Sequence, residues 1–358
     1  MLNLVYVLFG LIVLLLITRF TIQKKRYKRA VTSNEISEIK TFKLGGKEQK
    51  VLIEGKKKNL PVLITLHGGV GGAFGFNIGC RGLFEELTSE YIVVYWDQYG
   101  IGKNTGEINS DLTVETYVKM TVDLIKSIKN EYPDNKLFLF GVSWGSMLTC
   151  KSTNQMSQYI DGVVVFGHLL NRYYCTPDVF ETLLSKDIKK EDIEFLNSIE
   201  GKKYLEEDEL RKVCMLVHKK TNGNEYREKN VSCSKIYKLF LNPFLSPDYS
   251  LIEALRVYSK CRKFLKKTNL FEEIRKADLE DDLSKITVPY YILQGKEDLN
   301  TSTQNICGFV NESSNDNLHV KIINKSGHIP SNSGFVTLIE EVAKFKRKVE
   351  NFKISAKF

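Results

Sequence analysis

The chain has 358 residues, 42% hydrophobic and 27% charged, which is typical of a folded protein and argues against a disordered one. Its net charge is +9, but residues 1–30 carry six basic side chains and no acidic one, and no RNP, zinc-finger or helix-turn-helix pattern is present, so nucleic acid is not expected as a partner. Seven cysteines without CxxC or Cys/His spacing argue against a zinc site and a disulfide framework and suit a reducing compartment.

An apolar run over residues 4–17 lies near the start of the chain and continues to residue 22 around Arg19. A helix of about 17–20 residues is about 26–30 Å long, which matches the hydrocarbon thickness of a bilayer. A cleaved signal peptide would have basic residues before its apolar run and small residues at a cleavage site after it. Here the basic stretch "TIQKKRYKR" follows the run. The sequence therefore predicts an uncleaved transmembrane anchor over 1–22 and a basic juxtamembrane segment over 23–35, rather than a signal peptide or a buried core helix.

The basic flank also predicts the orientation of the chain. Lys and Arg that follow a transmembrane helix favour the cytoplasmic side. We therefore expect a single-pass membrane protein whose main domain lies on the cytoplasmic side and which contacts membrane lipid through residues 1–29.

Short apolar runs alternate with helical patterns from residue 36 onward. Continuous apolar runs are typical of parallel strands that are buried on both faces. The alternation predicts an α/β fold, in which a mostly parallel sheet is covered by helices on both faces. The predicted strands are 38–43, 49–53, 62–67, 92–97, 137–141, 162–167, 290–294 and 320–324.

This alternation stops between residues 168 and 285. The stretch is charged and helical in pattern, and it is too long for a simple connection within a compact sheet. We expect a helical cap over 168–285, inserted after the sixth strand, which divides the core into 36–167 and 286–350.

Residues 141–145 have the sequence Gly-Val-Ser-Trp-Gly, which matches G-x-S-x-G. A strand pattern leads into the motif and a helix-compatible run leaves it. Such a turn holds its central residue in a strained backbone conformation and exposes the side chain, while the flanking glycines let strand and helix pass closely. Ser143 is therefore the predicted nucleophile; an ordinary glycine-rich turn is the alternative, which would leave the partners described next unexplained.

A nucleophilic serine needs a base, and the base needs an orienting acid. Of five histidines, His328 lies in a loop between the last predicted strand and the final helix, from which it can reach Ser143 across the carboxyl edge of the sheet. Asp298, just past the strand 290–294, is the predicted acid, and Glu297 is the alternative. The order Ser143, Asp298, His328 is that of an α/β-hydrolase triad, which requires neither a metal nor an organic cofactor.

An oxyanion hole requires two backbone N–H donors. Trp144, directly after the nucleophile, supplies one, and Gly69 in "LHGGVGG" is the predicted source of the other. The glycine-rich loop contains neither GxGxxG nor GxxxxGK[ST], so it is not expected to bind a nucleotide.

Five ordered motifs, "LHGGVGG", "YWDQYGIGKN", "GVSWGS", "LQGKED" and "NKSGHIP", resemble those of the α/β-hydrolase superfamily, and most of all the proline iminopeptidase-like branch of its serine hydrolases. The resemblance covers about residues 60–345 except most of the cap. It implies an α/β-hydrolase fold with a Ser143–His328–Asp298 triad and oxyanion donors at Gly69 and Trp144. It also implies that His67 and Asp97 support the surrounding loops.

The sequence departs from that branch at Val70, Tyr99 and Asn104, where proline, arginine and serine are usual. Aminopeptidases of the branch bind the free amine of the substrate with cap carboxylates, for which the sequence offers several glutamates, although a charged helix face explains most of them. These are Glu200, Glu206, Glu207 and Glu209. The expected function is a serine hydrolase that cleaves an ester or amide of a small molecule or short peptide through an acyl-enzyme. An aminopeptidase, a membrane-associated carboxylesterase or lipase, and a non-catalytic binding protein of the same fold remain open.

Overall fold

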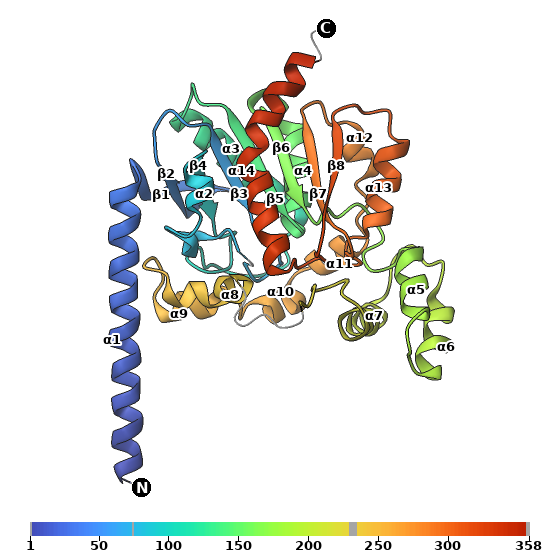
Figure 1. The fold of residues 1–358 in the computed structure, drawn as a ribbon, viewed down its shortest axis with the longest axis horizontal. Coiled ribbons are helices and arrows are strands. Elements are labelled where there is room, and N and C mark those ends of the chain that lie inside the picture. The colour runs from blue at the N-terminus through green and yellow to red at the C-terminus, as the bar shows by residue number, and fades with distance from the viewer. Residues whose placement is uncertain (1, 74, 229–234, 356–358) are drawn as a thin grey trace.

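The computed structural model describes residues 2–73, 75–228 and 235–355, and an eight-stranded sheet forms its centre (Figure 1). The strand order is β1-β2-β4-β3-β5-β6-β7-β8, with β1–β2 and β2–β4 antiparallel and the other neighbours parallel. All eight predicted strands are present. They are β1 (Ile36–Leu44), β2 (Lys47–Gly55), β3 (Val62–Leu66), β4 (Ile92–Trp96), β5 (Leu137–Val142), β6 (Gly162–Phe166), β7 (Tyr290–Gly295) and β8 (Leu318–Ile323).

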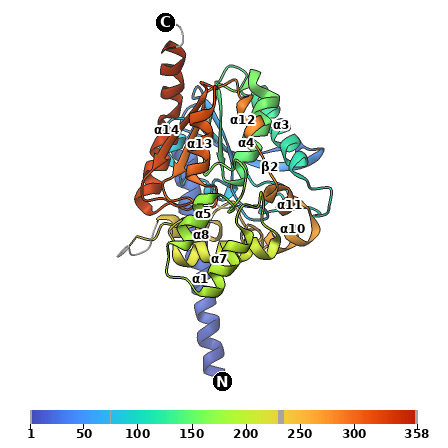
Figure 2. The same cartoon turned by 90° about the vertical axis from the view of Figure 1, so that its right-hand side faces the viewer.

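Helices cover both faces of the sheet. Helices α3 (Val114–Glu131) and α4 (Trp144–Met156) pack together on one face, and α2 (Glu85–Thr88) and α14 (Asn332–Ser355) lie on the other (Figure 2). Helix α13 (Thr303–Glu312) connects β7 to β8. The central strands β3, β4 and β6 are buried along their whole length, which is why their sequences are continuously apolar. This is the α/β-hydrolase arrangement that the strand and helix pattern predicted.

The chain between β6 and β7 is helical in its described residues. It forms α5 (Pro177–Leu184), α6 (Lys190–Ile199), α7 (Glu207–Lys220), α8 (Lys235–Leu245), α9 (Leu251–Arg256), α10 (Cys261–Lys267), α11 (Leu270–Arg275) and α12 (Glu280–Ser284). Helices α5–α7 enclose a small hydrophobic cluster of their own, whereas buried residues of α9, α10 and α11 join the main core. The insertion therefore has two parts, of which the second packs directly on the sheet domain.

Helix α1 (Leu2–Ser33) extends far beyond the rest of the molecule (Figure 1). By length and composition it is able to cross a membrane, because its most apolar 18-residue window has a mean hydropathy of 2.4. The basic segment predicted as a separate juxtamembrane unit continues the same helix to Ser33.

The second half of α1 is attached to the folded domain by arginine side chains. Arg19 Nε donates to the Phe244 carbonyl at 2.9 Å, and the Arg26 guanidinium donates to the carbonyls of Gly79 at 2.9 Å and Arg81 at 2.5 Å. Arg29 also donates to the Gly82 carbonyl at 2.7 Å. These bonds hold α1 at a defined position relative to the domain.

Candidate active site

Ser143 occupies a sharp turn between β5 and α4, with φ 51° and ψ −118°. Such a backbone conformation is rare for a residue with a side chain and is stable only where neighbouring structure enforces it. A Cβ on Gly145 would lie 2.0 Å from the Leu66 carbonyl oxygen, and one on Gly141 would lie 2.2 Å from Thr149 Oγ1. Strand and helix thus approach too closely at these positions for any residue except glycine, as the G-x-S-x-G motif predicted.

His328 lies between Ser143 and Asp298. Its Nε2 is 2.8 Å from Ser143 Oγ, and its Nδ1 is 2.8 Å from Asp298 Oδ2. The Asp298 carboxylate is fully buried, while the His328 side chain is 14% exposed. Glu297, the alternative acid, is exposed and does not contact the imidazole in the described structure. The loops after β5, β7 and β8 bring together the three residues predicted from their order in the sequence.

Further residues hold the Asp298 carboxylate in place. Its Oδ1 accepts the backbone N–H groups of Asn300 at 2.9 Å and Thr301 at 3.1 Å. Its Oδ2 accepts from Thr301 Oγ1 at 2.9 Å and Gln294 Nε2 at 3.2 Å. Gln294 belongs to the motif "LQGKED", but the sequence indicated neither its contact with this carboxylate nor that of Thr301.

The helical insertion also supports the loop that carries His328, a contact that no sequence motif indicated. The backbone N–H of His328 donates to the Gly223 carbonyl at 3.0 Å, and that of Ile329 donates to the Asn224 carbonyl at 2.8 Å. Residues 223 and 224, between α7 and α8, therefore fix the position of the loop that carries His328.

Gly69, the predicted oxyanion donor, has φ 79° and lines the same cavity as Ser143. Its loop is tied to the serine turn through Gln98, whose side chain accepts from Trp144 Nε1 at 2.8 Å and donates to the His67 carbonyl at 3.1 Å. Burial lowers the pKa of His67 to about 4, so its ring stays neutral and accepts the Gln98 N–H at 3.2 Å. Gln98 thus connects the two segments that carry the candidate donors.

Asp97 holds the neighbouring loop and contacts the helical insertion. Its carboxylate accepts the N–H groups of Ile78 at 2.9 Å and Lys103 at 2.7 Å, and the Tyr249 hydroxyl at 2.7 Å. Burial raises the pKa of Asp97 to about 6 despite these hydrogen bonds. His67 and Asp97, for which the resemblance implied supporting roles, both contact backbone around the site.

An apolar cavity of about 280 Å³ lies above Ser143 and His328. Its other lining residues come from the sheet domain and from the cap, and among the described residues no Asp, Glu, Lys or Arg is included. They are Gly68, Gly69, Gly75, Phe76, Val142, Phe166, Tyr173, Leu239, Tyr258, Ile329, Pro330, Phe335 and Leu338.

The four glutamates of the helical insertion do not line this cavity. Glu206 and Glu209 form the capping box at the start of α7, where Glu206 also pairs with Arg275 at 2.9 Å and Glu209 with Lys202 at 2.6 Å. Glu200 ends α6 and Glu207 begins α7, both exposed. The helix-surface explanation therefore accounts for them.

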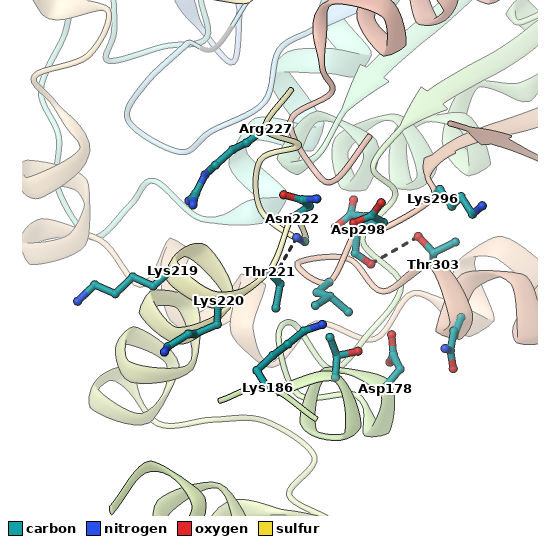
Figure 3. A pocket seen from close by; sticks show the side chains of 15 residues that line it. Asp178, Lys186, Lys219, Lys220, Thr221, Asn222, Arg227, Lys296, Asp298 and Thr303 are labelled. Atoms are coloured by element: carbon teal, nitrogen blue, oxygen red, sulfur yellow. Dashed lines mark hydrogen bonds between the residues drawn. The ribbon is translucent and has the colours of Figure 1, made fainter. Parts of the chain in front are cut away.

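A second cavity of about 460 Å³ lies behind Asp298 and includes neither Ser143 nor His328 (Figure 3). It is bordered by several cations: Lys219 and Lys220 extend to one side of it and Lys296 to the other (Figure 3), and Lys220 Nζ donates to the Asp187 carbonyl at 2.6 Å. In the described part of the chain, no group of three or more His, Cys, Asp or Glu side chains is arranged to hold a metal ion.

Comparison with known proteins agrees with this architecture. The family described as serine aminopeptidase, S33, matches residues 62–191. The probable aminopeptidase YbaC of Bacillus subtilis is 23% identical over 269 residues, which are 74% of this chain and 82% of the relative.

Two solved structures share the fold. The proline iminopeptidase of Mycobacterium smegmatis has a TM-score of 0.58 at 14% identity and covers 89% of this chain and 100% of its own. A bacterial membrane phospholipase A has a TM-score of 0.56 at 17% identity and covers 97% of this chain and 98% of its own.

The fold and these matches define a hydrolase of the α/β-hydrolase class. Within that class, the chain resembles the proline iminopeptidase-like branch of serine hydrolases.

Proposed function

We propose that the chain is a serine hydrolase in which Ser143, His328 and Asp298 form the catalytic triad. The observation that carries the proposal is the continuous hydrogen-bonded path from Ser143 Oγ through both ring nitrogens of His328 to Asp298, with both distances at 2.8 Å. In this arrangement the serine hydroxyl donates to neutral Nε2, and the Nδ1 proton is directed at the carboxylate.

The proposed reaction proceeds in two halves. Ser143 Oγ attacks the substrate carbonyl carbon while His328 takes the hydroxyl proton, and Asp298 stabilises the resulting imidazolium. The N–H groups of Gly69 and Trp144 donate to the carbonyl oxygen as it becomes an oxyanion. His328 then gives its proton to the departing alcohol or amine, which leaves an acyl-enzyme. Water then attacks that ester and gives a proton to His328, and His328 returns this proton to Ser143 Oγ as the acyl–oxygen bond breaks and the acid is released.

The cavity supports a carboxylic ester with an apolar acyl group as the substrate. Its described lining is almost entirely apolar, and apolar surface favours an acyl chain through removal of that chain from water. A free α-ammonium group there would lose hydration without a carboxylate to compensate, which costs free energy. An aminopeptidase is the second candidate, since the matching family and YbaC both carry that description.

We further propose that residues 168–285 act as a cap, between core segments 36–167 and 286–350, and that residues 1–22 anchor the chain in a membrane. The length and apolarity of α1 support the anchor, and the basic residues that follow it support a cytoplasmic position for the hydrolase domain. Retention of the full chain in the membrane pellet after carbonate extraction is the expected result, and release into the supernatant would contradict the anchor.

The test of function compares the full chain with Ser143→Ala. A fluorophosphonate probe should label the wild type, and p-nitrophenyl esters of acyl chains should be hydrolysed more efficiently than aminoacyl p-nitroanilides. Ser143→Ala should lose labelling and at least about 10³-fold in kcat/KM. Ser157→Ala, outside the cavity at the end of α4, is the matched control and should retain both. Turnover of aminoacyl substrates alone would favour the aminopeptidase, and a folded wild type that is not labelled would contradict the triad.

A further inference from the structure

The short helix α9 exposes an apolar face. Leu251 and Ile252 lie on the same side of it as Leu255, because residues four and three positions apart are neighbours on a helix surface. The opposite side carries buried Ala254, and Val257 follows, also buried, with its carbonyl accepting from the Ala73 N–H at 3.0 Å. The leucine and isoleucine side chains therefore point away from the sheet domain.

We call this exposed surface, with Leu241 of α8, the apolar cap face. Its members are 43–61% exposed, although full exposure of such side chains is unfavourable in water. They are Leu241 at 58%, Leu251 at 43%, Ile252 at 61% and Leu255 at 55%.

The acidic and basic side chains around the apolar cap face differ in their partners. The acids form ion pairs with the sheet domain: Asp248 pairs with Arg81 at 2.7 Å and Glu253 with Lys103 at 3.1 Å. The next stretch, "RVYSKCRKFLKK" over residues 256–267, carries six basic residues and no acid. Its exposed cations are Arg262, Lys263, Lys266 and Lys267. Apolar side chains beside Lys and Arg are typical of surfaces that dock on anionic lipid.

Helix α1 fixes the direction in which this surface faces. Arg19, at the end of the apolar run, donates to the carbonyls of Phe244 at 2.9 Å and Tyr249 at 2.6 Å, directly before α9. Figures 1 and 2 show the apolar first half of α1 continuing from this level past the cap, away from the sheet. A bilayer crossed by that half therefore begins on the side of the molecule occupied by the cap.

We propose that the apolar cap face of α8 and α9, with the cations of α10, docks on the surface of an anionic phospholipid bilayer. The docking inference rests on the proposed membrane anchor, and its activity readout rests in addition on the proposed hydrolase function. Contact with the bilayer removes the four exposed side chains from water and places the cations beside lipid phosphates.

The docked surface leads directly to the proposed catalytic cavity. Tyr258, three residues after Leu255, lines that cavity, as does Leu239, two residues before Leu241. An acyl substrate held in the bilayer thus meets the cap where its helices form the cavity wall.

Tryptophan fluorescence tests the contact in the full chain, because the native Trp96 and Trp144 are both buried. Leu255→Trp is reconstituted into phosphatidylcholine vesicles containing phosphatidylglycerol, with or without brominated phosphatidylcholine. Asp134→Trp is the matched control, since Asp134 is exposed in the loop before β5, at the edge of the sheet opposite the cap. After subtraction of the wild-type signal, brominated lipid should reduce Leu255→Trp emission at least about twofold and leave Asp134→Trp unchanged.

Equal emission changes in the two variants, in chains that float with the vesicles, would overturn the docking surface while leaving the anchor intact. Chains that do not float would overturn both. A change in oligomeric state of Leu255→Trp in detergent, without quenching by brominated lipid, would identify the face as a contact between copies of the chain and also overturn the proposal.

Activity gives a second readout. Ile252→Ser/Leu255→Ser should hydrolyse a long-chain ester embedded in the same vesicles about five- to tenfold more slowly than the wild type, with an unchanged rate on a water-soluble short-chain ester. An unchanged rate on both esters would contradict substrate delivery at this face. A folded wild type that does not hydrolyse the soluble ester would instead contradict the proposed function.

Discussion

The missing Cβ of Gly145 determines whether the serine turn can form. The Leu66 carbonyl oxygen lies 2.0 Å from where that atom would stand, so any side chain must separate β3 from α4. We expect Gly145→Ala to lower the free energy of unfolding by about 3 kcal/mol, the upper end of the usual range for an overpacked core. Chemical denaturation measures the change. Gly308→Ala in α13, where a Cβ meets nothing within 4 Å, is the control and should be neutral or stabilise by about 0.5–1 kcal/mol. Equal stability of the two variants would contradict the close approach.

Thr301 acts on the proposed chemistry through Asp298. Its hydroxyl donates to Asp298 Oδ2 at 2.9 Å and lies 3.3 Å from His328 Nδ1, so it orients the carboxylate toward the imidazole. We expect Thr301→Val to lower kcat about tenfold with little change in KM, because substrate binding does not involve this residue. Thr301→Ser retains the hydroxyl and should recover most of the rate. Steady-state kinetics on a soluble ester provide the measurement, and a change confined to KM would show that the residue has another role.

At the level of elements, the central strands β3, β4 and β6 were predictable because each is a short, continuous apolar run. The triad was predictable because its members follow β5, β7 and β8, and parallel strands bring their carboxyl ends to one edge of the sheet. Thr301, Gln294 and the Gly223 carbonyl could not be predicted, since their contacts depend on how irregular loops fold back. The helical nature of the insertion followed from composition, but its packing on α1 and the sheet domain depends on contacts between residues more than 200 positions apart, such as Arg19 and Phe244.

The seam between α1 and the domain relies on Arg26. Its guanidinium donates to the carbonyls of Gly79 and Arg81 and to the Asn242 side chain, so it joins the anchor helix to both the sheet domain and α8. Arg26→Leu leaves these acceptors without their donor. We expect a loss of about 2 kcal/mol in the free energy of unfolding, seen as a fall of several degrees in Tm in detergent. Lys25→Leu, at an exposed neighbouring position, should leave Tm within about one degree. Similar losses in both variants would show that the seam does not depend on these bonds.

At the scale of the whole molecule, several titratable groups are buried, and three of them make its stability depend on pH. Burial lowers the pKa of His67 and of His168 to about 4 and raises the pKa of Asp97 to about 6. Both ring nitrogens of His168 have hydrogen-bond partners in the neutral form: Nδ1 is 2.7 Å from the Leu169 carbonyl oxygen and Nε2 is 2.8 Å from the Tyr290 hydroxyl. Below pH 6.5 the unfolded chain protonates these histidines and the folded chain does not.

The sign of each contribution follows from these pKa values. Each histidine contributes stability that is present above pH 6.5 and is lost as pH falls to 4, about 3 kcal/mol apiece. Asp97 acts in the opposite direction, since its contribution is present below pH 3.8 and is lost as pH rises through 6. The two histidines outweigh the one carboxyl, so these groups together favour unfolding on acidification.

Replacement of one buried histidine should therefore change the pH dependence by a measurable amount. His168→Gln cannot take up a proton, so the loss of unfolding free energy between pH 7 and pH 4 should be about 3 kcal/mol smaller than in the wild type. The absolute stability of the variant is expected to be lower, because the amide does not reproduce both hydrogen bonds of the ring, but only the pH-dependent difference carries the prediction. Urea unfolding in detergent at both pH values measures it. His218→Gln, at an exposed position on α7, is the matched control and should follow the wild-type dependence. If His168→Gln loses as much stability on acidification as His218→Gln does, the buried imidazole is not what couples folding to pH.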